Sequence, residues 1–338
     1  MTPLARHASI FVFDYLPRDK GASPHTVEAY SQGLSLLLRF AAGRLKLKQP
    51  SQLALEQIDA DLVLAFLEDI EQRGASVSTR NARLAAIKAF FRFLEWREPS
   101  VLAQAAKIAL IPKKKADKSL VVWLTRTEIR ALLEAPDPRR WAGTRDRAML
   151  HLTYTCGLRV SELTALALAD YDRRTPASVR IMGKGRRERL LPLWKETRLA
   201  LEAWLRLRDP DGDQQLFHNR SGRGLSRWGF NVILAKHVKA ASMVETSLAN
   251  KRVTPHTLRH SCAMHTLQAN SGDVRKVSVW LGHATIKSTE VYLHADPTEK
   301  LEILDGVRAP RLRPGRFRAP DKLVAMLSGA SKGRRPMD

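Results

Sequence analysis

The segment TPHTLRHSCAMH, residues 254–265, contains three histidines and one arginine. His256 and His260 are four residues apart and would share a face of a helix, as the zinc-binding histidines of H-E-x-x-H proteases do. Arg259 lies between them and would repel a cation, and the chain offers no cysteine pair or carboxylate cluster as further ligands. We therefore expect no metal here, and instead chemistry that needs a guanidinium beside an imidazole.

Four other polar residues lie at glycine turns or at the end of a helical pattern. Arg159 follows Gly157-Leu158, and the other three are Lys184 in MGKGR, His283 in WLGH and Tyr292 in STEVYLH. Two guanidiniums can hold the non-bridging oxygens of one phosphate, and an imidazole can donate to it or carry a proton. A lysine can protonate a leaving alkoxide, and a tyrosine oxygen can attack phosphorus. Together they indicate phosphoryl transfer without a metal ion.

The order of these residues resembles the tyrosine recombinase (phage-integrase) family. The resemblance rests on GLRVSEL, GKGRRER, HTLRH and LGH, with a tyrosine nine residues after the last histidine. It covers roughly residues 20–300, and it implies a DNA breaking-rejoining fold for the second half of the chain. The six catalytic positions it implies are Arg159, Lys184, His256, Arg259, His283 and Tyr292.

The resemblance also implies a role for each of these residues. Tyr292 attacks a phosphodiester and forms a 3′-phosphotyrosyl link. Arg159 and Arg259 hold the pentavalent phosphorane. Lys184 is the general acid for the 5′-oxygen. The two histidines are His256, which assists proton transfer at the tyrosine, and His283, which donates to a non-bridging oxygen.

Residues near this set have simpler interpretations. Glu162, one turn after Arg159, either orients that arginine or caps its own helix, and the sequence leaves both readings open. His260 and His265 are expected to be structural, a helix turn beyond the site. Cys262 is expected to be a small core residue.

The bulk composition indicates a polyanionic partner. The 338-residue chain carries 57 Lys and Arg against 34 Asp and Glu, a net charge of +23. Such an excess favours nucleic acid over an anionic membrane, and no apolar run is long enough to cross a bilayer. With only two cysteines, no disulfide framework is expected, which fits a reducing cytoplasm. With the resemblance, this implies a cytoplasmic, nucleoid-associated bacterial protein.

The elements that must position these residues form two predicted domains, both mainly helical, with one small antiparallel sheet in the second. Residues 1–111 read as a helical domain, with helices over 23–43, 59–73 and 76–96, and are similar to the family's core-binding (SAM-like) domain. Residues 112–120 read as a basic linker, 121–303 as the catalytic domain and 304–338 as a basic tail. The catalytic domain should contain a Thr125–Glu128 capping box, a helix break at Gly157 and a hairpin around Lys184.

The third predicted helix should turn Leu84, Ile87, Phe91 and Leu94 inward and present a basic face to phosphates. That face, the linker and the hairpin tip supply the expected DNA-binding residues. They are Arg80, Asn81, Arg83, Lys88, Lys113, Lys114, Lys115 and Arg186.

The function expected from the resemblance is site-specific recombination of double-stranded DNA by four protomers on two sites. No cofactor is needed, because the phosphotyrosine conserves the bond energy, and partner recombinases are a further possibility. The long basic tail favours integration or transposition of a mobile element over resolution of chromosome or plasmid dimers. The alternatives of another class are a type IB topoisomerase-like enzyme and a non-catalytic DNA-binding regulator.

Overall fold

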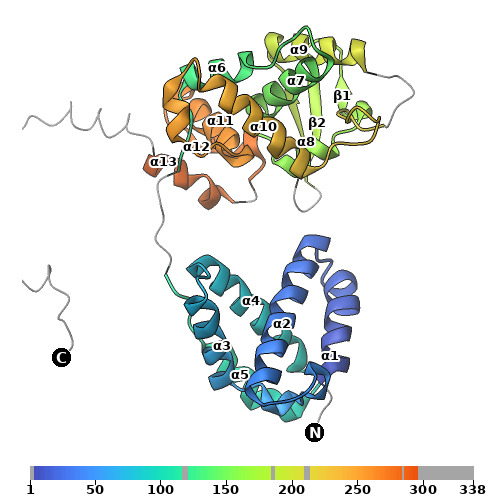
Figure 1. Cartoon of the computed structure of the whole chain (residues 1–338), viewed down its shortest axis with the longest axis vertical. Helices are drawn as coiled ribbons and strands as arrows, with labels where there is room; N and C mark the ends of the chain where they lie inside the picture. The colour runs from blue at the N-terminus through green and yellow to red at the C-terminus, as the bar shows by residue number, and fades with distance from the viewer. Residues whose placement is uncertain (1–3, 116–120, 184–186, 209–213, 284, 296–338) are drawn as a thin grey trace, which may run out of the picture. The chain divides into compact units, whose positions relative to one another are not determined.

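The computed structural model describes residues 4–115, 121–183, 187–208, 214–283 and 285–295. The chain divides into two compact units, Met1–Ser119 and Leu120–Asp338, each with its own buried hydrophobic core. The division falls inside the segment 112–120, which the sequence predicts to be a linker (Figure 1). The tail from residue 304 onward lies outside the described residues.

The first unit is a helical bundle. Its helices are α1 (Leu4–Ile10), the π-helical η1 (Phe11–Asp19), α2 (Pro24–Arg44), α3 (Ala60–Gln72), α4 (Val77–Leu94) and α5 (Leu102–Leu110). The side chains of Ser23, Asp59 and Ser76 accept hydrogen bonds at the N-termini of α2, α3 and α4, which stabilises each helix start. These three helices confirm the predicted ones to within two residues at each end.

Helix α4 is the centre of this unit and contacts α2, α3 and α5. The four predicted inward residues, Leu84, Ile87, Phe91 and Leu94, are all at most 1% exposed. Burial of such a continuous apolar stripe supplies most of the stability of a helix of this kind.

The polar face of α4 differs from the exposed phosphate-facing surface expected. Arg80 is only 4% exposed, and its Nη1 donates to the carbonyl oxygen of Pro112 at 3.1 Å. Asn81 donates to the Lys114 carbonyl at 2.8 Å and accepts from its N–H at 3.1 Å. The Lys88 ammonium donates to the carbonyls of Ala109 and Ile111.

Two further basic residues have partners inside the unit. Arg83 donates to Ala29 and Gln32 of α2, and Lys114 pairs with Glu71 of α3 at 2.8 Å. The sequence did not reveal these contacts because their partners lie 21 to 54 residues away along the chain. The α4 face therefore fixes the start of the predicted linker to the bundle.

The second unit is mainly helical with one three-stranded sheet. Its elements are α6 (Arg126–Glu134), α7 (Trp141–Thr155), α8 (Val160–Ala165), β1 (Tyr171–Asp172), β2 (Ser178–Met182), β3 (Glu188–Pro192), α9 (Lys195–Leu207), α10 (Arg227–Ala241), α11 (Pro255–Ala269), α12 (Val274–Leu281) and α13 (Glu290–Ala295). Helix α7 runs through its centre, contacts α9 and α11 (Figure 1), and is buried over most of its length.

Several predicted features of this unit are confirmed. Thr125 and Glu128 form the capping box at the start of α6, and Gly157 separates α7 from α8 with φ at +56°. Strands β2 and β3 form the predicted antiparallel hairpin. Strand β1, which pairs with β2 through Tyr171 and Val179, was not predicted, because two residues are too few to show a period.

Candidate active site

Arg259 links the loops that carry the other candidate residues. Its side chain is 4% exposed, and its two terminal nitrogens donate to the carbonyl oxygens of Gly157 and Leu281. Gly157 lies two residues before Arg159, and Leu281 lies two residues before His283. Burial, with the positive charge of Arg159, lowers the pKa of Arg259 to about 10, so the guanidinium stays charged at neutral pH.

Glu162 holds three arginines together. It accepts from the side chain of Arg159 at 2.7 Å and from that of Arg189 at 2.8 Å, and it lies 4.0 Å from Arg259. Burial alone would raise its pKa, but hydrogen bonds from the arginines hold that pKa below its ordinary value. One carboxylate facing three guanidiniums leaves an excess of two positive charges, which suits a phosphate.

Glu162 also accepts from the backbone N–H of Arg159 at 2.9 Å. The same carboxylate thus caps α8 and orients the arginine, so the two readings that the sequence left open hold at once. This is possible because the two oxygens of a carboxylate accept independently.

Arg189 is a member of this cluster that the sequence reasoning missed. It lies in β3, and its side chain is 9% exposed. Its Cδ lies 3.0 Å from the position that a Cβ would occupy at Gly282, in the turn before His283. The repeated basic residues of GKGRRERLL gave no sign of which one faces inward. The alternation along β3, with Leu191 buried and Leu190 exposed, could have indicated it, since residues two apart share a strand face.

Tyr292 lies in α13 beside α11. It is 2% exposed, and its hydroxyl is 3.0 Å from Nδ1 of His260. Burial raises the tyrosine pKa to about 12, although the charge of Arg259 acts in the opposite direction. His260 was expected to lie beyond the site, and the structure corrects that expectation. It follows Arg259 directly on a helix whose inner face points at α13.

His283 follows the left-handed Gly282, whose φ is +63°, a conformation that suits glycine. Its Nδ1 lies 2.7 Å from the hydroxyl of Thr289, and its ring stacks near that of Tyr292, with centroids 6.4 Å apart. Burial, together with the charges of nearby arginines, lowers its pKa to about 4. A neutral imidazole that accepts from Thr289 at Nδ1 carries its proton on Nε2 and can donate it.

The remaining predicted residues are not all in this cluster. His256 is exposed at the start of α11, with its ring centroid 6.4 Å from that of His260. Lys184 and Arg186 lie outside the described residues, while Lys113 and Lys115 are exposed in the other unit. The neighbouring His265 is structural as expected, with its Nδ1 2.7 Å from the Tyr154 hydroxyl in the core.

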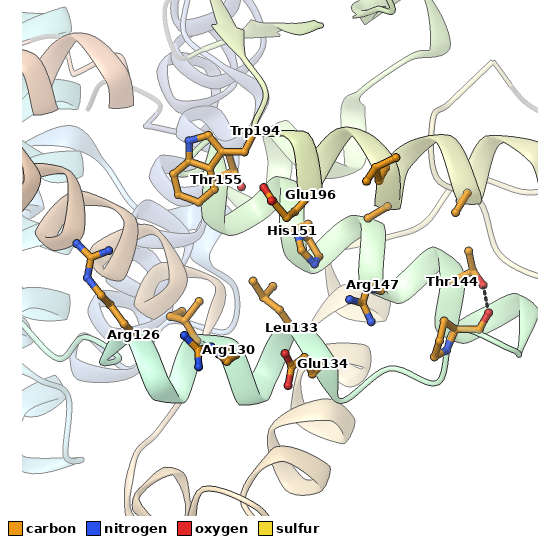
Figure 2. Close-up of a pocket in the computed structure, with 15 residues that line it drawn as sticks. Arg126, Arg130, Leu133, Glu134, Thr144, Arg147, His151, Thr155, Trp194 and Glu196 are labelled. Atoms are coloured by element: carbon orange, nitrogen blue, oxygen red, sulfur yellow. Dashed lines mark hydrogen bonds between the residues drawn. The ribbon is translucent and has the colours of Figure 1, made fainter.

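One cavity of this unit is separate from the cluster. It has a volume of about 610 Å³. Figure 2 shows Arg126 and Arg130 of α6 facing His151 of α7 and Trp194, before α9. None of the candidate catalytic residues lines it.

Two other kinds of feature are absent from the described residues. There, no group of three or more His, Cys, Asp or Glu side chains is placed to hold a metal ion. In the same part of the chain, no helix combines the length and the apolar character that a membrane crossing needs.

Two family models match the chain. Residues 122–299 match the phage integrase family, and residues 12–98 match the phage integrase N-terminal SAM-like domain. Both matches fall within the units that the structure separates. The first alone covers more than half of the chain and spans every residue of the cluster.

Similar sequences carry related names. A "putative integrase/recombinase y4rC" of Sinorhizobium fredii is 42% identical over 334 residues, which is 96% of this chain and 99% of the relative. A tyrosine recombinase XerC of Pelotomaculum thermopropionicum is 36% identical over 83% of this chain and 90% of its own length.

Solved structures share the fold. An integrase of the transposon Tn1549, in complex with a circular intermediate DNA, has a TM-score of 0.64 at 16% identity, covering 91% of this chain and all of the other. The XerH recombinase bound to palindromic difH has a TM-score of 0.64 at 22% identity, covering 85% and 81%.

Proposed function

Because the chain belongs to the phage integrase family and is a tyrosine site-specific recombinase, we propose that Tyr292 is its nucleophile. The observation that supports this is the convergence of three arginines on Glu162 within the unit that buries Tyr292 beside Arg259. The phenol oxygen attacks a phosphodiester and forms a 3′-phosphotyrosyl bond, and the 5′-oxygen leaves.

The arginines hold the phosphate during this step. Arg159 is 30% exposed at its side chain and presents its outer nitrogens to the DNA, while the buried Arg259 fixes the loops on both sides. Two fixed guanidiniums stabilise the charge that develops on the non-bridging oxygens without reorganising. His283 donates from Nε2 to one of these oxygens.

Lys184 completes the reaction as the general acid for the 5′-oxygen. The strands on either side of this lysine lie close to Glu162. Arg189 of β3 binds that carboxylate, and a Cβ at Gly183, which follows β2, would be 3.8 Å from its Oε1. The phosphotyrosyl bond retains the energy of the phosphodiester, so an incoming 5′-hydroxyl restores the DNA without ATP. The reaction as proposed needs no cofactor.

We assign the biological role to integration or transposition of a mobile element. The alignment with the S. fredii integrase/recombinase leaves out only 4% of this chain, so it includes most of the tail, residues 304–338. The alignment with the P. thermopropionicum XerC covers 83% of this chain, a smaller share than the 96% of the S. fredii alignment. Our second candidate role is resolution of chromosome or plasmid dimers. It is supported by several relatives named XerC or XerD.

The partners in this proposal are double-stranded recombination sites and further copies of the chain. One phosphotyrosyl event only nicks one strand, so exchange needs four protomers on two sites. We place this reaction in the bacterial cytoplasm, at the nucleoid. A solved relative is a lambda integrase dimer bound to a core site. A groove of about 600 Å³ between α7, α11 and α12, lined by Trp194, Val279 and Trp280, could receive the tail segment DKLVAMLSG of a second copy.

The test is capture of the covalent intermediate. Fragments of the DNA that flanks the gene are incubated with the protein, adducts are separated on a denaturing gel, and the attached ends are sequenced to define the site. A nicked suicide form of that site then traps the intermediate.

Wild type should give an adduct and Tyr292→Phe none, since the variant keeps the ring but lacks the attacking oxygen. No adduct with wild type would support a non-catalytic regulator, and an adduct with Tyr292→Phe would reject the nucleophile. Relaxation of supercoils by a monomer would support the topoisomerase-like alternative.

A further inference from the structure

His260 contacts the hydroxyl oxygen of Tyr292 directly. The resemblance instead implied that His256 assists proton transfer at this tyrosine. Nδ1 of His260 lies 3.0 Å from the Tyr292 hydroxyl oxygen, within the range of a good hydrogen bond. The two rings meet edge to face, with centroids 5.6 Å apart. His256 is exposed one turn earlier on α11, and its ring centroid is 6.4 Å from that of His260.

The direction of this hydrogen bond follows from the groups involved. A neutral imidazole has one donor nitrogen and one acceptor nitrogen. Tyr292 has a single proton, and a phenol with a pKa raised to about 12 by burial keeps it at neutral pH. The phenol therefore donates a hydrogen bond to Nδ1 of the neutral ring, and the ring carries its own proton on Nε2.

The surroundings of His260 keep the ring neutral. Burial, then the nearby His256 and Arg259, lowers its pKa to about 4. The other charged or titratable groups that act on this pair are Arg159 and Cys262, which act on Tyr292, and His283, whose pKa His260 helps to lower. Above the lowered pKa the ring is unprotonated, so the lone pair on Nδ1 is free to face the phenol.

We propose that His260 is the catalytic base that takes the phenolic proton when Tyr292 attacks the phosphodiester. The O–H bond of Tyr292 breaks and its proton passes to Nδ1. The phenol oxygen forms a bond to phosphorus, the bond from phosphorus to the 5′-oxygen breaks, and the general acid protonates that oxygen. In ligation, His260 returns the proton to the tyrosine. This inference rests on Tyr292 being the nucleophile.

The decisive variant is His260→Asn. An asparagine places its amide oxygen near the position of Nδ1, so it can keep the hydrogen bond but cannot take the proton. Cleavage is measured in single turnover on the captured site with a 5′-bridging phosphorothiolate at the scissile position. The sulfur leaves without protonation, so Lys184 does not affect the rate.

Wild type should cleave at a constant rate from neutral to moderately alkaline pH, because His260 is already neutral there. The His260→Asn variant should be about 100-fold slower near pH 7, the typical contribution of a positioned base. It should then regain roughly tenfold per pH unit, as the ionised fraction of the phenol rises below its pKa. A substitution that only disturbed the fold would lower the cleavage rate by the same factor at every pH.

His265→Asn is the matched control, because its Nδ1 makes the same kind of contact to the Tyr154 hydroxyl, away from the site. Its pH profile should stay flat. His260→Gln is the second variant, and binding of the duplex by each variant verifies that it is folded.

The proposal is overturned if His260→Asn cleaves like wild type, or if its rate is lowered by the same factor at all pH values. If wild type forms no adduct, the assignment of Tyr292 fails instead, so the two failures are distinguishable.

Discussion

At the scale of residues, the site depends on one carboxylate shared by several guanidiniums. Glu162 and its partners Arg189 and Arg259 are nearly buried, where an unpaired charge is very costly. Removing one member of a buried ion pair leaves the others uncompensated, which is more harmful than the loss of the pair itself. In the proposed reaction a bound phosphate offsets this excess of positive charge, so the protein without DNA holds the arginines together at an electrostatic cost.

Glu162→Gln separates the two functions of this residue. The glutamine can still accept from the Arg159 N–H and cap α8, but it removes the negative charge. We expect the free energy of unfolding to fall by about 3 kcal/mol and cleavage to slow, because Arg159 and Arg189 lose their common partner. Chemical denaturation and single-turnover cleavage measure the two effects. A loss of about 1 kcal/mol or less, as for a cap alone, with normal cleavage, would contradict the shared-carboxylate account.

At the scale of elements, α4 fixes the start of the linker to the first unit. Asn81 exchanges two hydrogen bonds with the backbone of Lys114, and Lys88 binds the carbonyls that end α5. Burial, with the charges of Lys113 and Arg80, lowers the pKa of Lys88. These contacts occupy the residues that the sequence pattern suggested for DNA.

Asn81→Ala should free this segment. Losing two hydrogen bonds of about 1 kcal/mol each should raise the open population more than tenfold, so trypsin should cut faster after Lys113, Lys114 and Lys115. Mass spectrometry of timed digests measures this. Arg83→Ala is the control, because Arg83 binds α2 instead, and its digestion at these lysines should match wild type. Equal acceleration in both variants would show general loosening of the bundle.

The elements were predictable where the signal is local. Caps such as Ser23 and the Thr125–Glu128 box, and the inward stripe of α4, follow from spacing along one helix. Arg189 and His260 were not found, because their roles depend on partners 27 and 32 residues away. The order of motifs identifies which residues reach a phosphate, but the fold decides which imidazole touches the tyrosine.

At the scale of the whole molecule, the charge is spread over both units, and each unit matches its own family model. With a net charge of +23, non-specific affinity should come mainly from the release of counterions. Not every lysine contributes equally, because some are already paired inside the protein.

The lysines at residues 113–115 test this distinction. Lys114 pairs with Glu71 at 2.8 Å, while the structure gives exposed Lys113 and Lys115 no acidic partner among the residues it describes. Each lysine that neutralises a phosphate contributes about 0.9 to the slope of log affinity against log salt concentration. Replacing Lys113 and Lys115 by Gln should therefore lower that slope by about 1.8, whereas Lys114→Gln should change it far less. Fluorescence anisotropy on a labelled duplex at several salt concentrations measures the slopes. If Lys114→Gln lowers the slope by as much as each of its neighbours does, the ion pair with Glu71 opens on DNA, and the linker detaches from α4 when the duplex binds.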